Sequence, residues 1–129
     1  MKYIVNVEIP KLDNIAFELD DKIAPKTVGQ FIKCLPFTVR VNVWGKEIYT
    51  DPTPLKATEE NEKPLVEMYD VAFWPPGNAI CLFYGPTPIG EKNQIRPYSP
   101  VNVIGKIINP DKATISRVEA GSKATFRKA

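Results

Sequence analysis

The sequence contains no histidine. This absence excludes Ser-His-Asp and Cys-His nucleophilic catalysis, histidine-containing zinc sites and a histidine general base near neutral pH. The chain also lacks the strings G-x-G-x-x-G, G-x-x-x-x-G-K-[ST] and G-x-S-x-G, which accompany dinucleotide binding, phosphate binding and hydrolysis. The usual sequence support for those activities is therefore missing, and we expect no cofactor and no metal site.

Cysteine is scarce as well. The chain has two cysteines, Cys34 and Cys81, which lie far apart and each stand in an apolar setting. This pattern favours two reduced, buried thiols, and a disulfide is the alternative.

Long apolar runs are absent too. The longest uncharged stretch, Val71 to Gly90, is broken by prolines and glycines and is therefore no membrane span. The opening M-K-Y-I-V-N-V-E reaches a carboxylate too early for the apolar core of a secretory signal, so we expect a cytoplasmic protein without a membrane partner. A net charge of +2 gives no reason to expect a nucleic-acid partner, even with Lys123, Arg127 and Lys128 close together.

The composition that remains is that of an ordinary globular protein. The chain has 129 residues, of which 43% are hydrophobic and 25% are charged, and these values suit one domain with one core. We therefore treat residues 1–129 as a single domain.

The most apolar part of the chain is a predicted hairpin. Two runs of strand-like composition, Val71–Trp74 and Ala79–Tyr84, are separated by P-P-G-N. Pro76 and Gly77 suit the two central positions of a type II turn, in which Gly77 would have a positive φ. Because so apolar a hairpin is not stable alone in water, we expect the rest of the chain to cover at least one of its faces.

Further strands are predicted by apolar residues that alternate with polar ones or gather in short runs. The first two predicted strands should pair as a hairpin, and the third and fourth should pair around Gly45. The predicted strands are Tyr3–Ile9, Ile15–Leu19, Phe37–Trp44, Glu47–Tyr49, Val101–Ile108 and Ala124–Phe126.

One strong and one weak helix are predicted. Pro25 suits the first helical position, Pro36 ends the pattern, and an apolar stripe lies between them at Val28, Phe31, Ile32 and Leu35. Asn109 and Pro110 suit the cap and first position of a short helix ending near Gly121.

Two long segments, Asp51–Pro64 and Pro86–Pro100, are rich in proline and polar residues, and we expect them to be solvated loops. The acidic cluster of Glu59, Glu60 and Glu62 belongs to the first of them. The whole pattern predicts a mainly β fold, a closed antiparallel eight-stranded barrel capped by one good helix and one short one.

Several segments carry a resemblance to a known family. Phe17–Lys33 resembles the cyclophilin segment that runs from the second strand into the first helix, and V-N-V-I-G-K-I-I at 101–108 resembles the cyclophilin strand H-V-V-F-G-K-V. Together with W-G-x-E-I-Y at 44–49 and V-A-F-W-P-P-G-N-A-I-C-L-F-Y-G at 71–85, they resemble a small prokaryotic cyclophilin-like family of uncharacterised proteins. One departure is Tyr69, where that family more often has glycine.

The resemblance implies prolyl isomerisation, and the residues for that reaction can be checked. Cyclophilins direct an arginine at the prolyl nitrogen from an F-H-R-x-I-P-G-F string, which this sequence lacks. The nearest fragment, F-T-V-R ending at Arg40, puts phenylalanine and arginine on opposite faces of a strand. The cyclophilin histidine and pocket phenylalanine correspond to Val101 and Cys81. We therefore expect a barrel that has lost its isomerase site.

Polar and aromatic residues on the less apolar strand faces and in loops remain as candidates for ligand binding. For the tryptophans, packing against the sheet is the alternative, and for Arg40 with Glu47 it is a surface ion pair across a hairpin. Asn102 stands on an apolar strand, where a half-buried amide needs hydrogen-bond partners that the backbone could also supply. The candidates are Arg40, Trp44, Glu47, Tyr49, Trp74, Arg96, Tyr98 and Asn102.

Three functional hypotheses follow. The first is a module that binds a small molecule or a proline-containing peptide. The second is a peptidyl-prolyl isomerase with a rebuilt site that uses Arg40 or Arg96. The third is a non-catalytic subunit or scaffold with an apolar contact patch at Trp44 and Tyr49. Any enzymatic activity, the ligand and the oligomeric state stay open at this stage.

Overall fold

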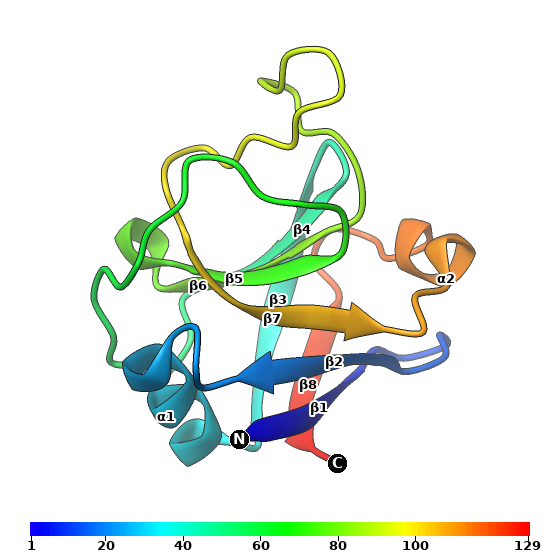
Figure 1. Cartoon of the computed structure of the whole chain (residues 1–129). Helices are drawn as coiled ribbons and strands as arrows, with labels where there is room; N and C mark the ends of the chain where they lie inside the picture. The colour runs from blue at the N-terminus through cyan, green and yellow to red at the C-terminus, as the bar shows by residue number, and fades with distance from the viewer.

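A computed structural model describes all 129 residues. Eight strands and two α-helices follow one another along the chain (Figure 1). No helix is both long enough and apolar enough to cross a membrane. The elements are β1 Lys2–Glu8, β2 Ile15–Asp20, α1 Pro25–Cys34, β3 Phe37–Trp44, β4 Glu47–Thr50, β5 Asp70–Trp74, the 3-10 turn η1 Pro75–Gly77, β6 Ala79–Phe83, β7 Asn102–Ile108, α2 Lys112–Ser116 and β8 Lys123–Lys128.

The eight strands form the closed antiparallel barrel that the sequence predicts. Their order around the barrel is β1-β2-β7-β5-β6-β4-β3-β8, and the pairing of β8 with β1 closes it. The predicted hairpins β1–β2, β3–β4 and β5–β6 are all present. Because β1 and β8 are neighbours, the two termini lie side by side (Figure 1).

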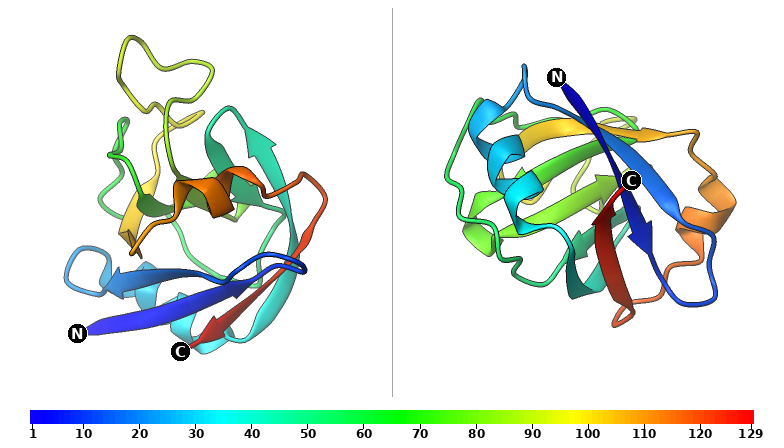
Figure 2. Two further views of the ribbon diagram at one scale, coloured as in Figure 1. Left: turned by 90° about the vertical axis from the view of Figure 1, so that its right-hand side faces the viewer. Right: turned by 90° about the horizontal axis from the view of Figure 1, so that it is seen from below.

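The predicted strong helix is α1, and it lies at one end of the barrel, with α2 at the opposite end (Figures 1 and 2). Val28 and Phe31 are fully buried, so the apolar stripe faces the core. The Phe31 ring lies 5.8 Å from Phe17 and 6.2 Å from Phe126, which joins the helix to β2 and β8. This burial supplies the stability that a short helix lacks by itself.

The second helix differs from its prediction in position and length. Asp111 caps it by accepting from the backbone N–H groups of Ala113 and Thr114, and the helix ends at Ser116. A carboxylate at this position satisfies two N–H groups that have no partner within the helix. Asn109 instead has a φ of 44° and lies before the helix.

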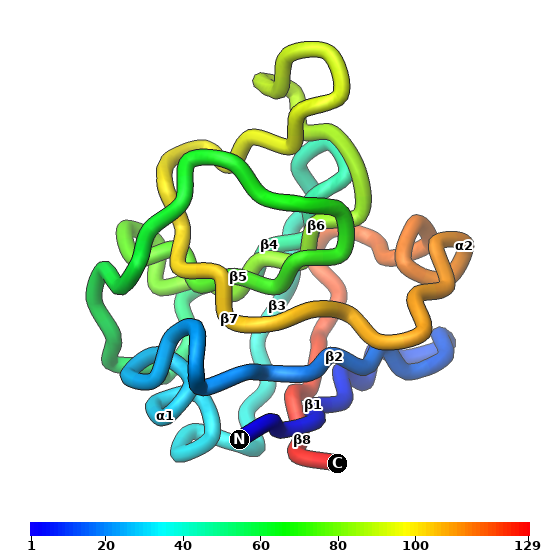
Figure 3. The backbone as a smooth tube through the Cα atoms, in the orientation of Figure 1, coloured from blue at the N-terminus to red at the C-terminus, as the bar shows by residue number.

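Both faces of the β5–β6 hairpin are buried. Phe73, Ile80 and Leu82 belong to the core inside the barrel, whereas Ala72 and Cys81 belong to a second, smaller cluster on the outside. The outer cluster is covered by the segments on either side of the hairpin, and Figure 3 shows these two segments on the same side of the barrel. Because both faces of the hairpin are largely buried, its strands are nearly continuous runs of apolar residues.

The turn of this hairpin is not the predicted type II turn. Pro75–Gly77 forms a 3-10 turn that ends at Asn78, whose φ is 51°. Asn78 therefore has the left-handed conformation expected of Gly77. The Asn78 side chain explains this preference because it donates to the carbonyls of Thr53, at 2.6 Å, and Leu55, at 2.9 Å.

The acidic loop after β4 is less solvated than predicted. Leu55 is buried, and the Glu60 carboxylate accepts from the backbone N–H groups of Lys26 and Thr27 at the start of α1. Burial disfavours the charged form of Glu60, but the hydrogen bonds from Thr27 and Lys26 outweigh it and lower the pKa of the carboxyl. One residue of the loop is therefore a helix cap supplied from a distant part of the chain.

Tyr69 has a φ of 70° immediately before β5. It thus keeps the left-handed conformation that glycine, the residue more frequent here in the resembling family, adopts without strain. Hydrogen bonds on both sides hold it: its N–H donates to Phe83, at 2.6 Å, and its carbonyl accepts from Ile107, at 2.8 Å.

Candidate functional site

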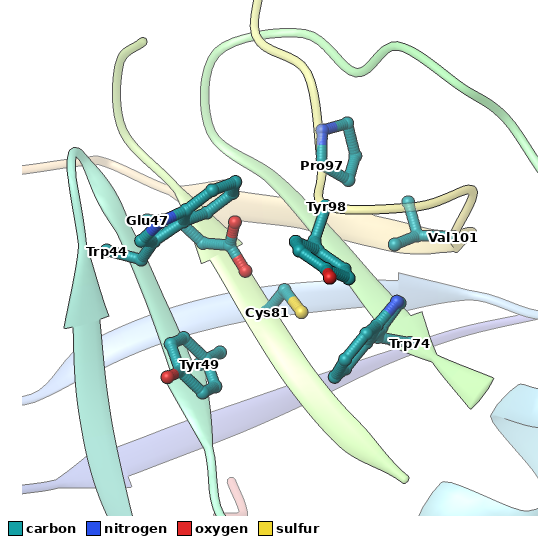
Figure 4. Close-up of a pocket in the computed structure, with 8 residues that line it drawn as sticks. All are labelled: Trp44, Glu47, Tyr49, Trp74, Cys81, Pro97, Tyr98 and Val101. Carbon is teal, nitrogen blue, oxygen red and sulfur yellow. The ribbon is translucent and has the colours of Figure 1, made fainter. Parts of the chain in front are cut away.

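A cavity of about 280 Å³ lies on the outside of the barrel. Its floor is formed by side chains of the barrel strands, and the chain leading into β7 forms one wall (Figure 4). Six of its eight lining residues are hydrophobic. The lining consists of Trp44, Glu47, Tyr49, Trp74, Cys81, Pro97, Tyr98 and Val101.

Strand pairing brings together the residues that form the floor of this cavity. Trp44 is opposite Glu47 in the β3–β4 pair, and Tyr49 is opposite Cys81 in the β4–β6 pair. Alternation along β4 puts Glu47 and Tyr49 on the outer face, while Ile48 between them joins the barrel core. Residues from three strands thus share one outward-facing surface.

Three aromatic rings line much of the cavity. The Tyr98 ring makes edge-to-face contacts with Trp44, at 6.2 Å, and Trp74, at 5.9 Å between ring centroids. The indole N–H of Trp74 donates to the Ser99 hydroxyl at 2.6 Å, which fixes the ring and ties it to the loop. Tyr98 is 73% exposed, so it bridges the tryptophans at the mouth of the cavity (Figure 4).

Glu47 is the only acidic residue in the lining, and it is 5% exposed. Its Oε1 atom is buried and has no hydrogen-bond partner. Burial raises the pKa of Glu47 to about 7, although hydrogen bonding with the Cys81 thiol opposes part of the rise. A buried carboxyl without a counter-charge is costly, so this residue is poorly explained by the stability of the fold alone.

Cys81 lies beside this carboxyl on the cavity floor (Figure 4). Burial, the charge of Glu47 and the hydrogen bond to it raise the pKa of the Cys81 thiol well above its usual value. The thiol therefore stays protonated near neutral pH and is a poor nucleophile. Both cysteines are free, as the sequence predicts, although Cys34 is only partly buried.

The structure brings together five of the eight candidate residues that the sequence predicts. Trp44, Glu47, Tyr49, Trp74 and Tyr98 all line the cavity.

The two arginines lie elsewhere. Arg40 is exposed and donates to the carbonyl of Gly121 at 2.7 Å, and it is opposite Lys123 in the β3–β8 pair. The predicted ion pair between Arg40 and Glu47 is therefore wrong, because Glu47 belongs to a part of the sheet that pairs with Trp44 and Phe83. Arg96 approaches the Gln94 side chain at 3.5 Å and does not line the cavity.

Asn102 is fully buried outside the cavity lining. Its amide donates to Thr27, at 3.2 Å, and to the Thr58 carbonyl, at 2.9 Å, while its oxygen accepts from the N–H of Glu60 at 2.8 Å. The need for partners is thus met within the protein, by two backbone groups and one hydroxyl. Asn102 holds the acidic loop and α1 against β7.

Three lining residues were not among the predicted candidates: Cys81, Pro97 and Val101. Period-two alternation and the β4–β6 pairing would have placed Cys81 beside Tyr49, had that pairing been known. Pro97 and Val101 flank Tyr98 along one loop, and no local pattern distinguishes them from its other residues. No group of three His, Cys, Asp or Glu side chains is arranged to hold a metal ion.

Comparison with known proteins agrees with the barrel. The cyclophilin-like family model matches residues 3–127. The chain belongs to the cyclophilin-like family. The solution structure of a hypothetical protein from Archaeoglobus fulgidus is 38% identical and superposes with a TM-score of 0.82, over 99% of this chain and 95% of the archaeal one. No curated protein matches the sequence.

Because the chain belongs to the cyclophilin-like family, the lining of the cavity can be compared with the cyclophilin proline site. Val101 and Cys81, which correspond to the cyclophilin histidine and pocket phenylalanine by the resemblance given above, both line it. Two positions that the resemblance assigns to the cyclophilin proline site therefore belong to the cavity lining, and each has a different side chain here. No arginine is among the lining residues.

Proposed function

We propose that this cyclophilin-like protein is a binding module that holds a small ligand or a short peptide segment in the cavity between Trp44 and Trp74. The preformed cavity, largely apolar with one convergent polar group, is the observation that supports the proposal. Ligand sites in proteins have this composition, and the cavity volume of about 280 Å³ lies just below their usual range of about 300–1,000 Å³. The occupant is therefore a small molecule or the side chain of one or two peptide residues.

The binding module has no efficient prolyl isomerase activity. The uncatalysed barrier of about 18–20 kcal/mol comes from amide resonance, and a cation directed at the prolyl nitrogen would have to weaken that resonance. The guanidinium of Arg40 is engaged by Gly121, and Arg96 lies near Gln94. Neither lines the cavity, so the arrangement favours binding over isomerisation.

The two tryptophans make the binding proposal testable, because both of them line the cavity and the chain has no others. Their indole N–H signals in a proton–nitrogen NMR spectrum report on this one site. A set of small aromatic, heterocyclic and amide compounds, together with a proline-containing tetrapeptide, would be added to the labelled protein. We expect some of them to shift both indole signals saturably.

Two variants give this experiment its control. Tyr98→Ala removes the ring that bridges the tryptophans and should weaken binding, whereas Ile89→Ala changes another exposed apolar side chain of the same loop, outside the cavity lining, and should not. If no compound shifts the indole signals at millimolar concentration, the binding proposal is wrong.

A protease-coupled assay on a proline-containing peptide tests the second part of the proposal. We expect no acceleration of cis-trans isomerisation at micromolar protein. Acceleration that disappears in Arg40→Ala or Arg96→Ala would instead establish a rebuilt isomerase site.

A further inference from the structure

The carboxyl group of Glu47 is an unsatisfied acceptor inside an otherwise apolar cavity. The side chain is 5% exposed, and its Oε1 atom has no partner from the protein. Figure 4 shows the carboxyl group pointing from beneath Trp44 toward Cys81 and Tyr98. An acceptor in this position is satisfied when a ligand in the cavity offers it a donor.

No positively charged side chain of the protein forms an ion pair with Glu47. The four ion pairs in the structure involve other carboxylates, and no lysine or arginine lines the cavity. Lys46 is adjacent in sequence, but its side chain runs along Gly85. A positive charge for Glu47 therefore has to come from outside the chain.

The walls of the cavity suit a cation. Trp44, Trp74 and Tyr98 surround the space above Glu47, and Tyr49 adds a fourth ring (Figure 4). Aromatic faces attract organic cations through their quadrupole, and the attraction strengthens where water is excluded. A carboxylate among such rings adds the opposite charge and a hydrogen-bond acceptor.

We infer that the cavity binds a small organic ammonium ion that keeps at least one N–H, with this N–H donating to the carboxylate of Glu47 and the carbon atoms packing between Trp44, Trp74 and Tyr98. This inference rests on the proposed binding function and specifies its ligand class. Because the carboxylate of Glu47 needs a donor, protonated primary, secondary and tertiary amines fit, whereas a quaternary ammonium ion satisfies only the rings.

The proton and the ammonium ion compete for Glu47. Burial raises the pKa of Glu47 to about 7, so lowering the pH neutralises the group that holds the cation. The other titratable groups facing it are the thiol of Cys81 on β6, the phenol of Tyr49 on β4 and the phenol of Tyr98 in the loop. Near neutral pH the Cys81 thiol is uncharged, because burial and the neighbouring Glu47 raise its pKa.

Four compounds built on one six-membered ring separate the contributions of the positive charge and of the N–H donor. They are piperidinium, its neutral ether analogue tetrahydropyran, the amide 2-piperidone, and quaternary N,N-dimethylpiperidinium. Their dissociation constants would be measured by tryptophan fluorescence and by the indole NMR signals. At about pH 8.5 we expect piperidinium to bind at least about tenfold more tightly than the other three. At about pH 5.5 its affinity should fall about thirtyfold, since one proton competes for a group with a pKa of about 7.

Charge-matched variants provide the control. Glu47→Gln keeps the size of the side chain and should remove the preference for piperidinium over tetrahydropyran together with the pH dependence. Glu91→Gln removes the same charge from an exposed position outside the cavity lining, so it should change neither. Tyr98→Ala, which alters only an exposed side chain, should weaken binding of piperidinium at both pH values.

Several results would overturn the inference and leave the binding proposal intact. Equal binding of tetrahydropyran, or unchanged binding of piperidinium to Glu47→Gln, would show that Glu47 does not hold a cation. Tighter binding of the quaternary ion would show that the rings alone do so. Preference for 2-piperidone at low pH would show that protonated Glu47 donates to a carbonyl. If neither these compounds nor the wider set shift the indole signals, the binding proposal fails instead.

Discussion

The backbone N–H of Glu60 donates to the side-chain oxygen of Asn102 at 2.8 Å, while the Glu60 carboxylate accepts from the first turn of α1. This pair of residues joins three parts of the chain: the acidic loop, the first helix and β7. Asn102 is fully buried, so water cannot replace any of the hydrogen bonds it makes.

Asn102→Ala should therefore destabilise the protein strongly. It removes the partners of the Glu60 N–H, the Thr58 carbonyl and the Thr27 hydroxyl, and we expect the free energy of unfolding to fall by about 2–4 kcal/mol. Urea denaturation followed by far-ultraviolet circular dichroism would measure the change. Asn42→Ala is the matched control, because its bond to Asp51 is exposed, and it should cost less than about 1 kcal/mol. An equal loss in both variants would contradict this account of Asn102.

The second prediction concerns the pH dependence of stability. The pKa of Glu47 is about 7 in the folded protein and ordinary, 4.5, when the chain unfolds, so the folded state holds an extra proton between these values. The contribution of the neutral carboxyl to the free energy of unfolding is thus fully present below about pH 4.5 and is lost as the pH rises through about 7. The total loss is up to about 3 kcal/mol. Glu47→Gln, which stays neutral, should be more stable than the wild type at about pH 8 and similar to it at about pH 4.

Urea denaturation of both proteins across this pH range would test the prediction. The difference in unfolding free energy between Glu47→Gln and the wild type isolates the contribution of this one carboxyl, because the two proteins differ at no other residue and the buried Cys81 thiol, whose pKa is raised, stays protonated over this range. A difference that does not change with pH would mean that Glu47 ionises normally.

Two glycine substitutions should act in opposite directions. Gly29 lies exposed within α1, and a Cβ atom there would meet nothing within 4 Å, so Gly29→Ala should stabilise the protein by about 0.5–1 kcal/mol. Gly105 lies in β7, where a Cβ atom would collide with the carbonyl oxygen of Glu18 on β2. Gly105→Ala should therefore force the two strands apart and lower stability by more than about 2 kcal/mol.

Thermal unfolding monitored by circular dichroism would compare the two variants directly. We expect Tm to rise for Gly29→Ala and to fall for Gly105→Ala. A rise for both would mean that β2 and β7 are not packed as closely as described.

The fourth prediction concerns thiol reactivity. Cys81 is 1% exposed, and its pKa is raised by burial and by Glu47, whereas Cys34 is partly exposed. A thiol reagent such as iodoacetamide should therefore label Cys34 first, and mass spectrometry of the digested protein would identify the site. A ligand in the cavity should slow labelling of Cys81 further and leave Cys34 unaffected. Faster labelling of Cys81 would contradict the burial described for it.

Prediction from the sequence succeeds here for elements whose pattern of apolar residues depends only on their own stretch of the chain. The stripe containing Val28 and Phe31 predicts α1 because helical periodicity is a local property of the chain. The paired strands β1 and β2 follow from alternation in the same way. Local reasoning fails at Gly77, because the side-chain hydrogen bonds of Asn78 to a distant loop decide which residue has the positive φ.

The sequence by itself thus determined the eight-stranded barrel, the strong helix, the absence of histidine chemistry and an inventory of polar and aromatic candidates. Only the tertiary structure decided which candidates share a site. Arg40, Glu47 and Asn102 all lie on strands, yet one is exposed, one lies in a cavity and one holds a loop in place. The three environments differ because strand pairing and loops distant in sequence set the burial and the partners of each side chain. Neither the burial nor the partners can be deduced from the residues next to that side chain in the sequence.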